Sequence, residues 1–258
     1  MLTDIWKSSV RQKTKDLDVL LGQAQMAFSL AGKFGNELSD LLGLDPVTSY
    51  IEGELKDPDR IRQKADNKYG GDLSRVCDIA RSRILFDSPD QIHKFRKIVK
   101  GGQNSHPFLK TWQGRVEIIN KSLGDYYERP KFGGYVGINM NLKVNLGGNR
   151  YHICEMQLMH KEMQPTDKES HKLYEQMREI TDFAEAEQRN LTYEEGAMVS
   201  SLQRTNIELY YYDINRLGLW PLLPETGHVH AELREQDLQN TSSPASIVTA
   251  VAPPRHSL

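Results

Sequence analysis

The amino-acid sequence predicts a mixed α/β protein of the α+β class, in which N-terminal and C-terminal helices flank a small mixed sheet. Three observations predict it: a helical apolar pattern near the N-terminus, consecutive strand patterns in the middle, and two long helical patterns after them. The 258 residues, 38% of them hydrophobic, suffice for a sizeable core without disulfides. We expect four segments: N-terminal helices over 1–50, a core over 51–187, C-terminal helices over 188–235 and a disordered tail over 236–258.

The predicted helices are marked by apolar periodicity and by capping residues. From about Thr14 to Leu44, apolar residues recur three and four positions apart. Asp57 is a predicted N-cap followed by Pro58, so a second helix runs from there to about Tyr69. The same signals predict three further helices, over Asp90 to Val99, Asp167 to Glu187 and Tyr193 to Leu217.

The clearest strand signal is the segment from Tyr135 to Leu146, where apolar and polar residues alternate throughout. This alternation indicates one face on a core and one polar face. Gly147-Gly148-Asn149 is typical of a hairpin turn, and a second strand is predicted from Tyr151 to Met159. A buried strand over Val76 to Phe86 and a short strand over Arg115 to Asn120 complete the predicted sheet.

The formal net charge of −2 argues against a dedicated nucleic-acid-binding or membrane-surface protein. The sequence has no apolar run of the roughly 20 residues that a membrane span needs, and Met1 to Val10 has no apolar signal core. Cys77 and Cys154 alone form neither a disulfide framework nor a metal cluster. We therefore expect a cytoplasmic protein with no membrane partner, or one delivered into a target cell by a non-Sec system.

Two acidic residues stand within apolar, strand-like runs. Asp78 lies in Val76 to Phe86, and Glu155 lies in Tyr151 to Met159. Carboxylates are rarely buried without partners. If the two strands are neighbours, the two acids could hold a hard cation such as Mg²⁺. The alternative is that each acid is partly solvated and pairs with a nearby arginine or lysine.

A basic cluster surrounds the predicted second helix. Lys56, Arg60, Lys64 and Lys68 follow one another at four-residue spacing, and Arg62 lies between them. Like charges at this spacing repel, so an anion such as a nucleoside triphosphate would relieve a cost. The alternative is a solvated face that the neighbouring acids compensate.

The glycine-rich segment from Pro130 to Asn139 allows close approach of its backbone to a ligand. Tyr135 begins the polar face of the following strand, where its ring could stack on a nucleobase. The alternative is an ordinary turn that leads into an edge strand.

In order and spacing, Leu55 to Arg178 resembles the synthetase domain of the RelA/SpoT-like enzymes, which make the alarmones guanosine tetra- and pentaphosphate, (p)ppGpp. The matching elements are Lys56 and Lys64, Asp78-Ile-Ala-Arg-Ser-Arg83-Ile, Asp125-Tyr126-Tyr127 leading into Pro130-Lys131-Phe-Gly-Gly-Tyr135, and Glu155-Met-Gln157. Any one motif is unspecific, but four in this order are specific. The sequence has no His-Asp pair, so the resemblance is to a divergent, synthetase-only member.

The resemblance implies a nucleotidyltransferase-like sheet and an ATP-dependent pyrophosphokinase. Such an enzyme transfers the β,γ-pyrophosphate of ATP to the ribose 3′-hydroxyl of GDP or GTP and releases AMP. By position, Asp78 and Glu155 are the catalytic acids and the ligands of Mg²⁺, with Glu155 alternatively the base. The residues implied in ATP binding are Lys56, Arg62, Lys64 and Arg83, and those implied in acceptor binding are Lys131, Tyr135, Asn139 and Gln157.

Several positions depart from the pattern of the family. They are Glu54, Arg81, Asn139 and the pair Met159-His160. Because some of them lie near the acceptor, adenine nucleotides or the tRNA 3′ end, as in toxin-type relatives, are alternative acceptors. Without its own hydrolase, the enzyme would need an antitoxin, an immunity protein or a separate hydrolase as partner. The terminal helices could form a homo-oligomer.

Two further alternatives fall in other classes. The first is a catalytically inactive regulator that binds nucleotides. The second is an unrelated α+β protein with chance motif matches, which a structure without neighbouring Asp78 and Glu155 strands would indicate. Retention of both acids favours the enzyme, because a simple binder has little use for two carboxylates facing phosphates.

Overall fold

The computed structural model describes residues 10–127, 130–131 and 135–219 of the chain. Two predicted features lie outside the described residues: the tail over 236–258, and Phe132, Gly133 and Gly134 of the glycine-rich segment. The chain divides into two compact units, one of 1–129 with 136–162 and one of 130–135 with 163–258. In this division, the helix that follows the sheet groups with the C-terminal helix.

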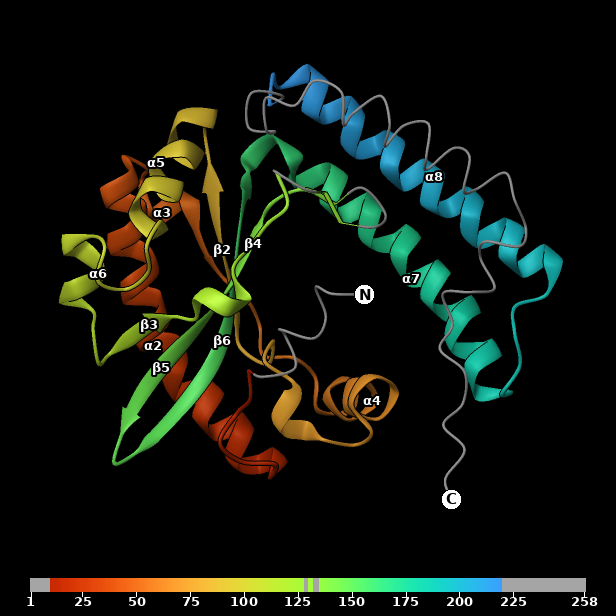
Figure 1. Ribbon diagram of the computed structural model, residues 1–258, viewed down its shortest axis with the longest axis horizontal. Coiled ribbons are helices and arrows are strands. Elements are labelled where there is room, and N and C mark those ends of the chain that lie inside the picture. The colour runs from red at the N-terminus through yellow and green to blue at the C-terminus, as the bar shows by residue number, and fades with distance from the viewer. Residues whose placement is uncertain (1–9, 128–129, 132–134, 220–258) are drawn as a thin grey trace. The chain divides into compact units, whose positions relative to one another are not determined.

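A mixed sheet forms the centre of the first unit (Figure 1). Its described strands have the order β1-β2-β6-β5-β3, with β4 paired to β5. β2 and β6 are parallel and the other described pairs are antiparallel. The predicted fold class is thus confirmed. The strands are β1 Tyr50–Glu52, β2 Arg81–Phe86, β3 Val116–Ile118, β4 Gly124–Asp125, β5 Ile138–Gly147 and β6 Arg150–His160.

The β5–β6 hairpin follows the predicted alternation. Met140 pairs with Met156, and Asn141 pairs with Glu155. Because side chains alternate between faces, the methionines share the buried face and Asn141 and Glu155 share the polar one. β5 begins at Ile138, three residues later than predicted. The reason is a local loop, in which the Lys131 N–H donates to the carbonyl of Tyr135 (3.1 Å) before the strand begins.

Helix α2, Leu17–Leu42, packs on the apolar face of the sheet and confirms the first predicted helix. The Asp16 carboxylate caps its first turn by accepting from the Val19 N–H (3.0 Å). Gly35 permits the close approach, since a Cβ there would collide with the Tyr50 ring and lie 3.3 Å from Met156 Cε. In Figure 1, α2 lies on one side of the sheet and α4 on the other.

The remaining helices of the first unit are short. α4 runs over Pro58–Tyr69, and the Asp57 side chain caps it as predicted by accepting from the N–H groups of Asp59 and Arg60. Gly70 ends α4 in the left-handed conformation at φ 59°. The other elements are α3 Pro46–Ser49, α5 Pro89–Val99, α6 Pro107–Thr111 and the 3₁₀ turns Leu73–Arg75, Asn120–Ser122 and Lys161–Met163.

Two long helices dominate the second unit, α7 Gln164–Ala186 and α8 Tyr193–Arg216. They lie side by side as an antiparallel pair (Figure 1). Polar contacts join them, from the Thr166 hydroxyl to Asp213 and from the Tyr210 hydroxyl to Asp167. Both predicted helices are present; α8 begins at its predicted residue, and α7 begins three residues before Asp167. No helix in the described part of the chain is long and apolar enough to cross a membrane.

The prediction of a strand over Val76 to Phe86 is wrong in its first half, because β2 begins only at Arg81. The Val76 N–H instead donates to the carbonyl of Leu73 and closes a 3₁₀ turn. Beyond it, the carbonyl of Ile79 accepts from the Lys56 N–H and that of Ala80 from the Glu155 N–H. The segment between Val76 and Arg81 therefore makes backbone hydrogen bonds to Lys56 on one side and to Glu155 on the other, without the regular pairing of a strand. Asp78 lies in this segment and not in the middle of a strand.

Candidate active site

The site is built around Asp78, whose carboxylate is buried between two lysines. One oxygen, Oδ2, lies 2.7 Å from the Lys56 ammonium and 2.8 Å from the Lys64 ammonium. Lys64 comes from α4, and Lys56 from the segment before α4, held in place by its backbone bond to Ile79 (2.9 Å). Two lysines of the predicted basic cluster therefore pair with Asp78, which lies outside the cluster. The alternative of a solvated face compensated by its neighbouring acids does not describe these two lysines.

Electrostatics keep this group of three ionised. Burial by itself would raise the pKa of Asp78, but the adjacent lysines outweigh it and hold that pKa far below its usual value. Burial would lower the pKa of Lys64, but the charge of Asp78 raises it overall. For Lys56, burial dominates and lowers the pKa. Two cations thus share one buried anion.

The second carboxylate oxygen of Asp78, Oδ1, is buried and has no hydrogen-bond partner among the described residues. Buried carboxylate oxygens without partners are costly, and a hard cation is the ligand they best accept. The oxygen chemistry of Asp78 therefore fits a hard cation such as Mg²⁺. No group of three His, Cys, Asp or Glu side chains in the described residues forms a metal site.

Glu155 belongs to a chain of side chains on the polar face of the sheet. The Arg83 guanidinium donates to Gln157 Oε1 (2.9 Å), and the Gln157 amide donates to Glu155 Oε1 (2.7 Å). The register explains the meeting, since Arg83 of β2 lies opposite Gln157 of the parallel strand β6. Because Asp78 precedes β2, the alternation of side chains along that strand does not decide on which side Asp78 lies relative to Arg83.

Asp78 and Glu155 come from neighbouring segments, although Asp78 precedes β2 and does not lie on a strand as predicted. The Glu155 N–H donates to the carbonyl of Ala80, two residues after Asp78 (3.0 Å). The charge of Glu155 also contributes to the raised pKa of Lys64. The two acids and the two lysines are therefore parts of one electrostatic site.

The predicted acceptor residues fall in both units. In the first unit, Asn139 of β5 is in register with Gln157 of β6, and both are half-buried. In the second unit, the Lys131 ammonium lies over the Tyr135 ring, 4.9 Å from its centroid. The Tyr135 ring also makes an edge contact with Tyr210 of α8, with centroids 5.9 Å apart.

Arg62, predicted to bind ATP, lies on the exposed side of α4. Its guanidinium contacts Asp59 at 2.9 Å, and 57% of its side chain is exposed. Lys56 and Lys64 pair with Asp78, whereas Arg62 pairs with Asp59, and the role of Arg62 in binding ATP stays a prediction.

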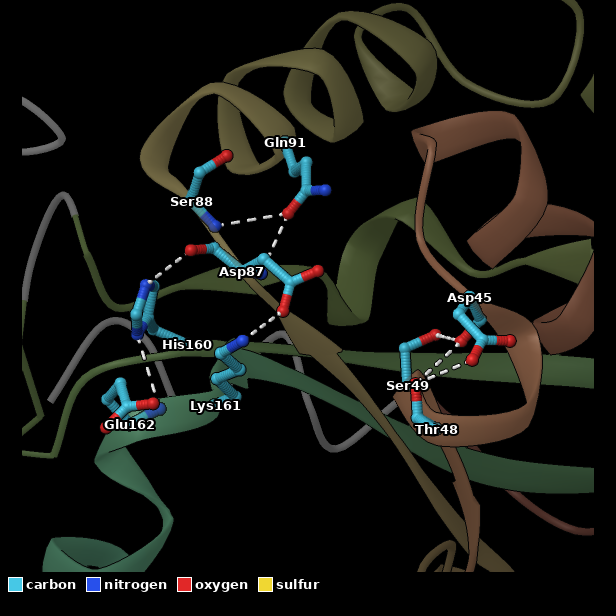
Figure 2. A network of polar contacts seen from close by, with 9 residues as sticks. All are labelled: Asp45, Thr48, Ser49, Asp87, Ser88, Gln91, His160, Lys161 and Glu162. Carbon is cyan, nitrogen blue, oxygen red and sulfur yellow. Dashed lines mark hydrogen bonds and ion pairs between the residues drawn. The ribbon is translucent and has the colours of Figure 1, made fainter.

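His160, one of the departures from the family pattern, has a structural role at the end of β6. Its Nε2 lies 3.1 Å from the carbonyl oxygen of Asp87, and its Nδ1 accepts from the Glu162 N–H (3.3 Å), as Figure 2 shows. Its own N–H donates to the Tyr127 hydroxyl (2.9 Å). Burial lowers its pKa, so a neutral ring joins the end of β6 to the loop after β2.

Comparison with known proteins gives matches only at the level of structure. No family model and no curated protein matches the sequence. Small alarmone synthetase 2 from Bacillus subtilis is 21% identical with a TM-score of 0.51, over 78% of this chain and 96% of that one. Small alarmone synthetase 1 from Bacillus subtilis, bound to its product pppGpp, is 15% identical with a TM-score of 0.52, over 77% and 93%. Another structure of synthetase 1 is 16% identical with a TM-score of 0.50, over 84% and 97%. The chain therefore has the fold of the small alarmone synthetases.

Proposed function

We propose that the protein is an ATP-dependent pyrophosphokinase. It transfers the β,γ-pyrophosphate of ATP to the ribose 3′-hydroxyl of a guanine nucleotide, forms (p)ppGpp and releases AMP. The observation that carries this proposal is the buried Asp78, whose Oδ2 pairs with both Lys56 and Lys64 and whose Oδ1 has no hydrogen-bond partner among the described residues.

The charges favour a polyphosphate substrate. Lys56 and Lys64 place two positive charges against a single buried carboxylate, so an incoming phosphate group finds cations already oriented. Pyrophosphoryl transfer depends chiefly on positioning and charge neutralisation, and lysines supply both. Asp78 and Glu155 would hold Mg²⁺, which when bound neutralises phosphate charge.

In this proposal, Glu155 accepts the proton of the attacking hydroxyl. Its carboxylate is half-buried and is oriented by the bond from Gln157, which Arg83 holds in turn. Asn139 and Gln157 of the first unit would bind the acceptor, and a role of Lys131 and Tyr135 of the second unit in acceptor binding stays a prediction. A guanine nucleotide is the first choice, because the structure of synthetase 1 described above contains pppGpp.

The experiment is a transfer assay with labelled ATP and Mg²⁺, run separately with GDP, GTP, ADP, AMP and bulk tRNA. We expect AMP release coupled to label in GDP or GTP, abolished in Asp78→Ala and in Glu155→Ala. Glu169→Ala, which removes an exposed acid paired with Lys172 on α7, is the matched control and should retain activity.

The other outcomes are informative. Label in adenine nucleotides or tRNA would replace the guanine acceptor with one of the toxin-type acceptors. Nucleotide binding without AMP release from any mixture would contradict the enzyme and favour the inactive regulator. As an independent check, inducible expression should arrest growth only when Asp78 and Glu155 are intact.

A further inference from the structure

The segment Val10–Lys13, which we call the N-terminal strap, crosses the sheet beside the candidate site. It bonds to two parts of the first unit that are distant in sequence. On one side, Arg11 pairs with Asp72, and the Cys77 thiol approaches the carbonyl of Val10 at 3.7 Å. On the other side, the Tyr151 hydroxyl donates to the carbonyl of Arg11 (3.3 Å).

Gln12 is the residue of the strap that joins the two sides. Its side-chain amide donates to the carbonyl of Ile153 (2.9 Å), and its Oε1 accepts from the Ile153 N–H (2.8 Å). The same amide donates to the carbonyl of Val76 (3.3 Å), while the Gln12 N–H donates to the carbonyl of Ser74 (2.7 Å). Gln12 is only 4% exposed.

These bonds replace a strand pairing that the sheet lacks. β2 pairs with β6 only from Arg81 and Glu155 onward, so Ile153 has no partner from β2. The Gln12 amide offers one donor and one acceptor side by side, as the backbone of a neighbouring strand would. It therefore extends the sheet by one position with a side chain.

The position of this bridge relates it to the two acids. Val76 lies two residues before Asp78, and Ile153 lies two residues before Glu155. On the other side of Asp78, the bond between Ala80 and Glu155 joins the same two segments. The segment that carries Asp78 is thus fixed to β6 on both sides of the acid.

We propose that Gln12 is a positioning residue that sets the placement of Asp78 relative to Glu155. The proposal rests on the proposed function for its catalytic consequence, but its structural part stands on the contacts of Gln12 alone. Without the Gln12 amide, buried backbone groups of Ile153 and Val76 lose their partners. The segment before Asp78 is then free to shift, although both acids remain in the chain.

Two variants and a control test the proposal. Gln12→Ala removes the bridge. Gln12→Glu keeps the size and the acceptor for the Ile153 N–H but loses the donors to the carbonyls of Ile153 and Val76. Tyr151→Phe is the control, because it removes a strap hydrogen bond of an exposed hydroxyl and leaves Gln12 intact.

The catalytic measurement separates positioning from simple loss of folded protein. With the activity of the wild type as reference, Gln12→Ala should lower kcat roughly 10- to 100-fold. It should raise the half-saturating Mg²⁺ concentration about tenfold, with little change in KM for ATP. Gln12→Glu should act in the same direction, and Tyr151→Phe should match the wild type. Wild-type kcat and Mg²⁺ dependence in Gln12→Ala would overturn the proposal and leave the proposed function standing.

A second measurement does not depend on activity. Amide hydrogen exchange in residues 76–80 and 153–155 should accelerate in both Gln12 variants and stay unchanged in Tyr151→Phe. If the wild type releases no AMP with any acceptor, the proposed function fails, and this exchange measurement alone decides on Gln12. Unchanged protection of these amides in Gln12→Ala would overturn the positioning role.

Discussion

The Lys64 ammonium and the Asp78 carboxylate lie 2.8 Å apart, although they come from a helix and from an irregular segment on the other side of a 3₁₀ turn. The oxygen that Lys64 contacts is the same one that Lys56 contacts. An acid buried between two cations is costly to assemble and adds little stability compared with apolar residues of similar size. Stability therefore does not account for this group, which agrees with the proposed role of the two lysines in binding phosphates.

The first prediction concerns the stability of this group of three. Asp78→Asn should lower the free energy of unfolding at pH 7 by about 3 kcal/mol, because two partly buried lysines lose their shared anion. The triple variant Asp78→Leu, Lys56→Met, Lys64→Met should recover much of that loss while remaining inactive. Urea unfolding measures both. A fully stable Asp78→Asn would mean that water already compensates the lysines.

The second prediction concerns the orientation of Glu155. Gln157→Met keeps the size of the side chain but removes the hydrogen bonds to Arg83 and Glu155. We expect kcat of the transfer reaction to fall roughly 10- to 100-fold, with a change in unfolding free energy of less than about 1 kcal/mol because Gln157 is half-buried. Steady-state kinetics and thermal unfolding test this. Unchanged kcat would show that Glu155 needs no partner to be oriented.

The third prediction concerns the pH dependence of stability through His152. This side chain on the apolar face of β6 is fully buried, its ring nitrogens have no partner in the described structure, and burial lowers its pKa to about 4. The unfolded chain takes up the proton near pH 6.5. The folded protein therefore binds fewer protons between pH 4 and 6.5, and His152 makes stability fall as the pH falls through that range.

His152→Leu should remove this contribution of His152 to the pH dependence of stability. When the pH is lowered from 7.5 to 5, the wild type should lose about 2 kcal/mol more free energy of unfolding than the variant loses. His171→Gln, which changes an exposed histidine of α7, should show no such difference from the wild type. Urea unfolding at the two pH values measures the difference. Parallel pH profiles for wild type and His152→Leu would contradict the buried, neutral state of the ring.

The fourth prediction compares two glycines of α2. A Cβ at Gly35 would collide with the Tyr50 ring, whereas a Cβ at Gly22 would meet no atom within 4 Å. Gly35→Ala should therefore cost roughly 1–3 kcal/mol through overpacking, and Gly22→Ala should gain roughly 0.5–1 kcal/mol through helix propensity. Thermal unfolding of the pair is the test. Equal stabilisation by both alanines would show that α2 can move away from β1.

Local sequence signals determined the elements that depend on neighbouring residues. Asp57 and Pro58 predicted the start of α4, because a cap and its first turn are made within a few residues. The alternation along β5 predicted which of its side chains are buried and which are polar, since the period of two belongs to any strand. Asp78 and Glu155 could be chosen because acids in apolar runs require a partner.

The tertiary structure alone decided which partners those acids have. An apolar run does not reveal where pairing begins, so Asp78 was placed within a strand that starts only at Arg81. Gln12 carries no sequence signal, because its bonds to Val76 and Ile153 span more than 60 and more than 140 positions of the chain. Such contacts depend on how separate segments pack, which no local pattern encodes. Sequence thus determined the elements and the candidate acids, and packing determined the site that they form.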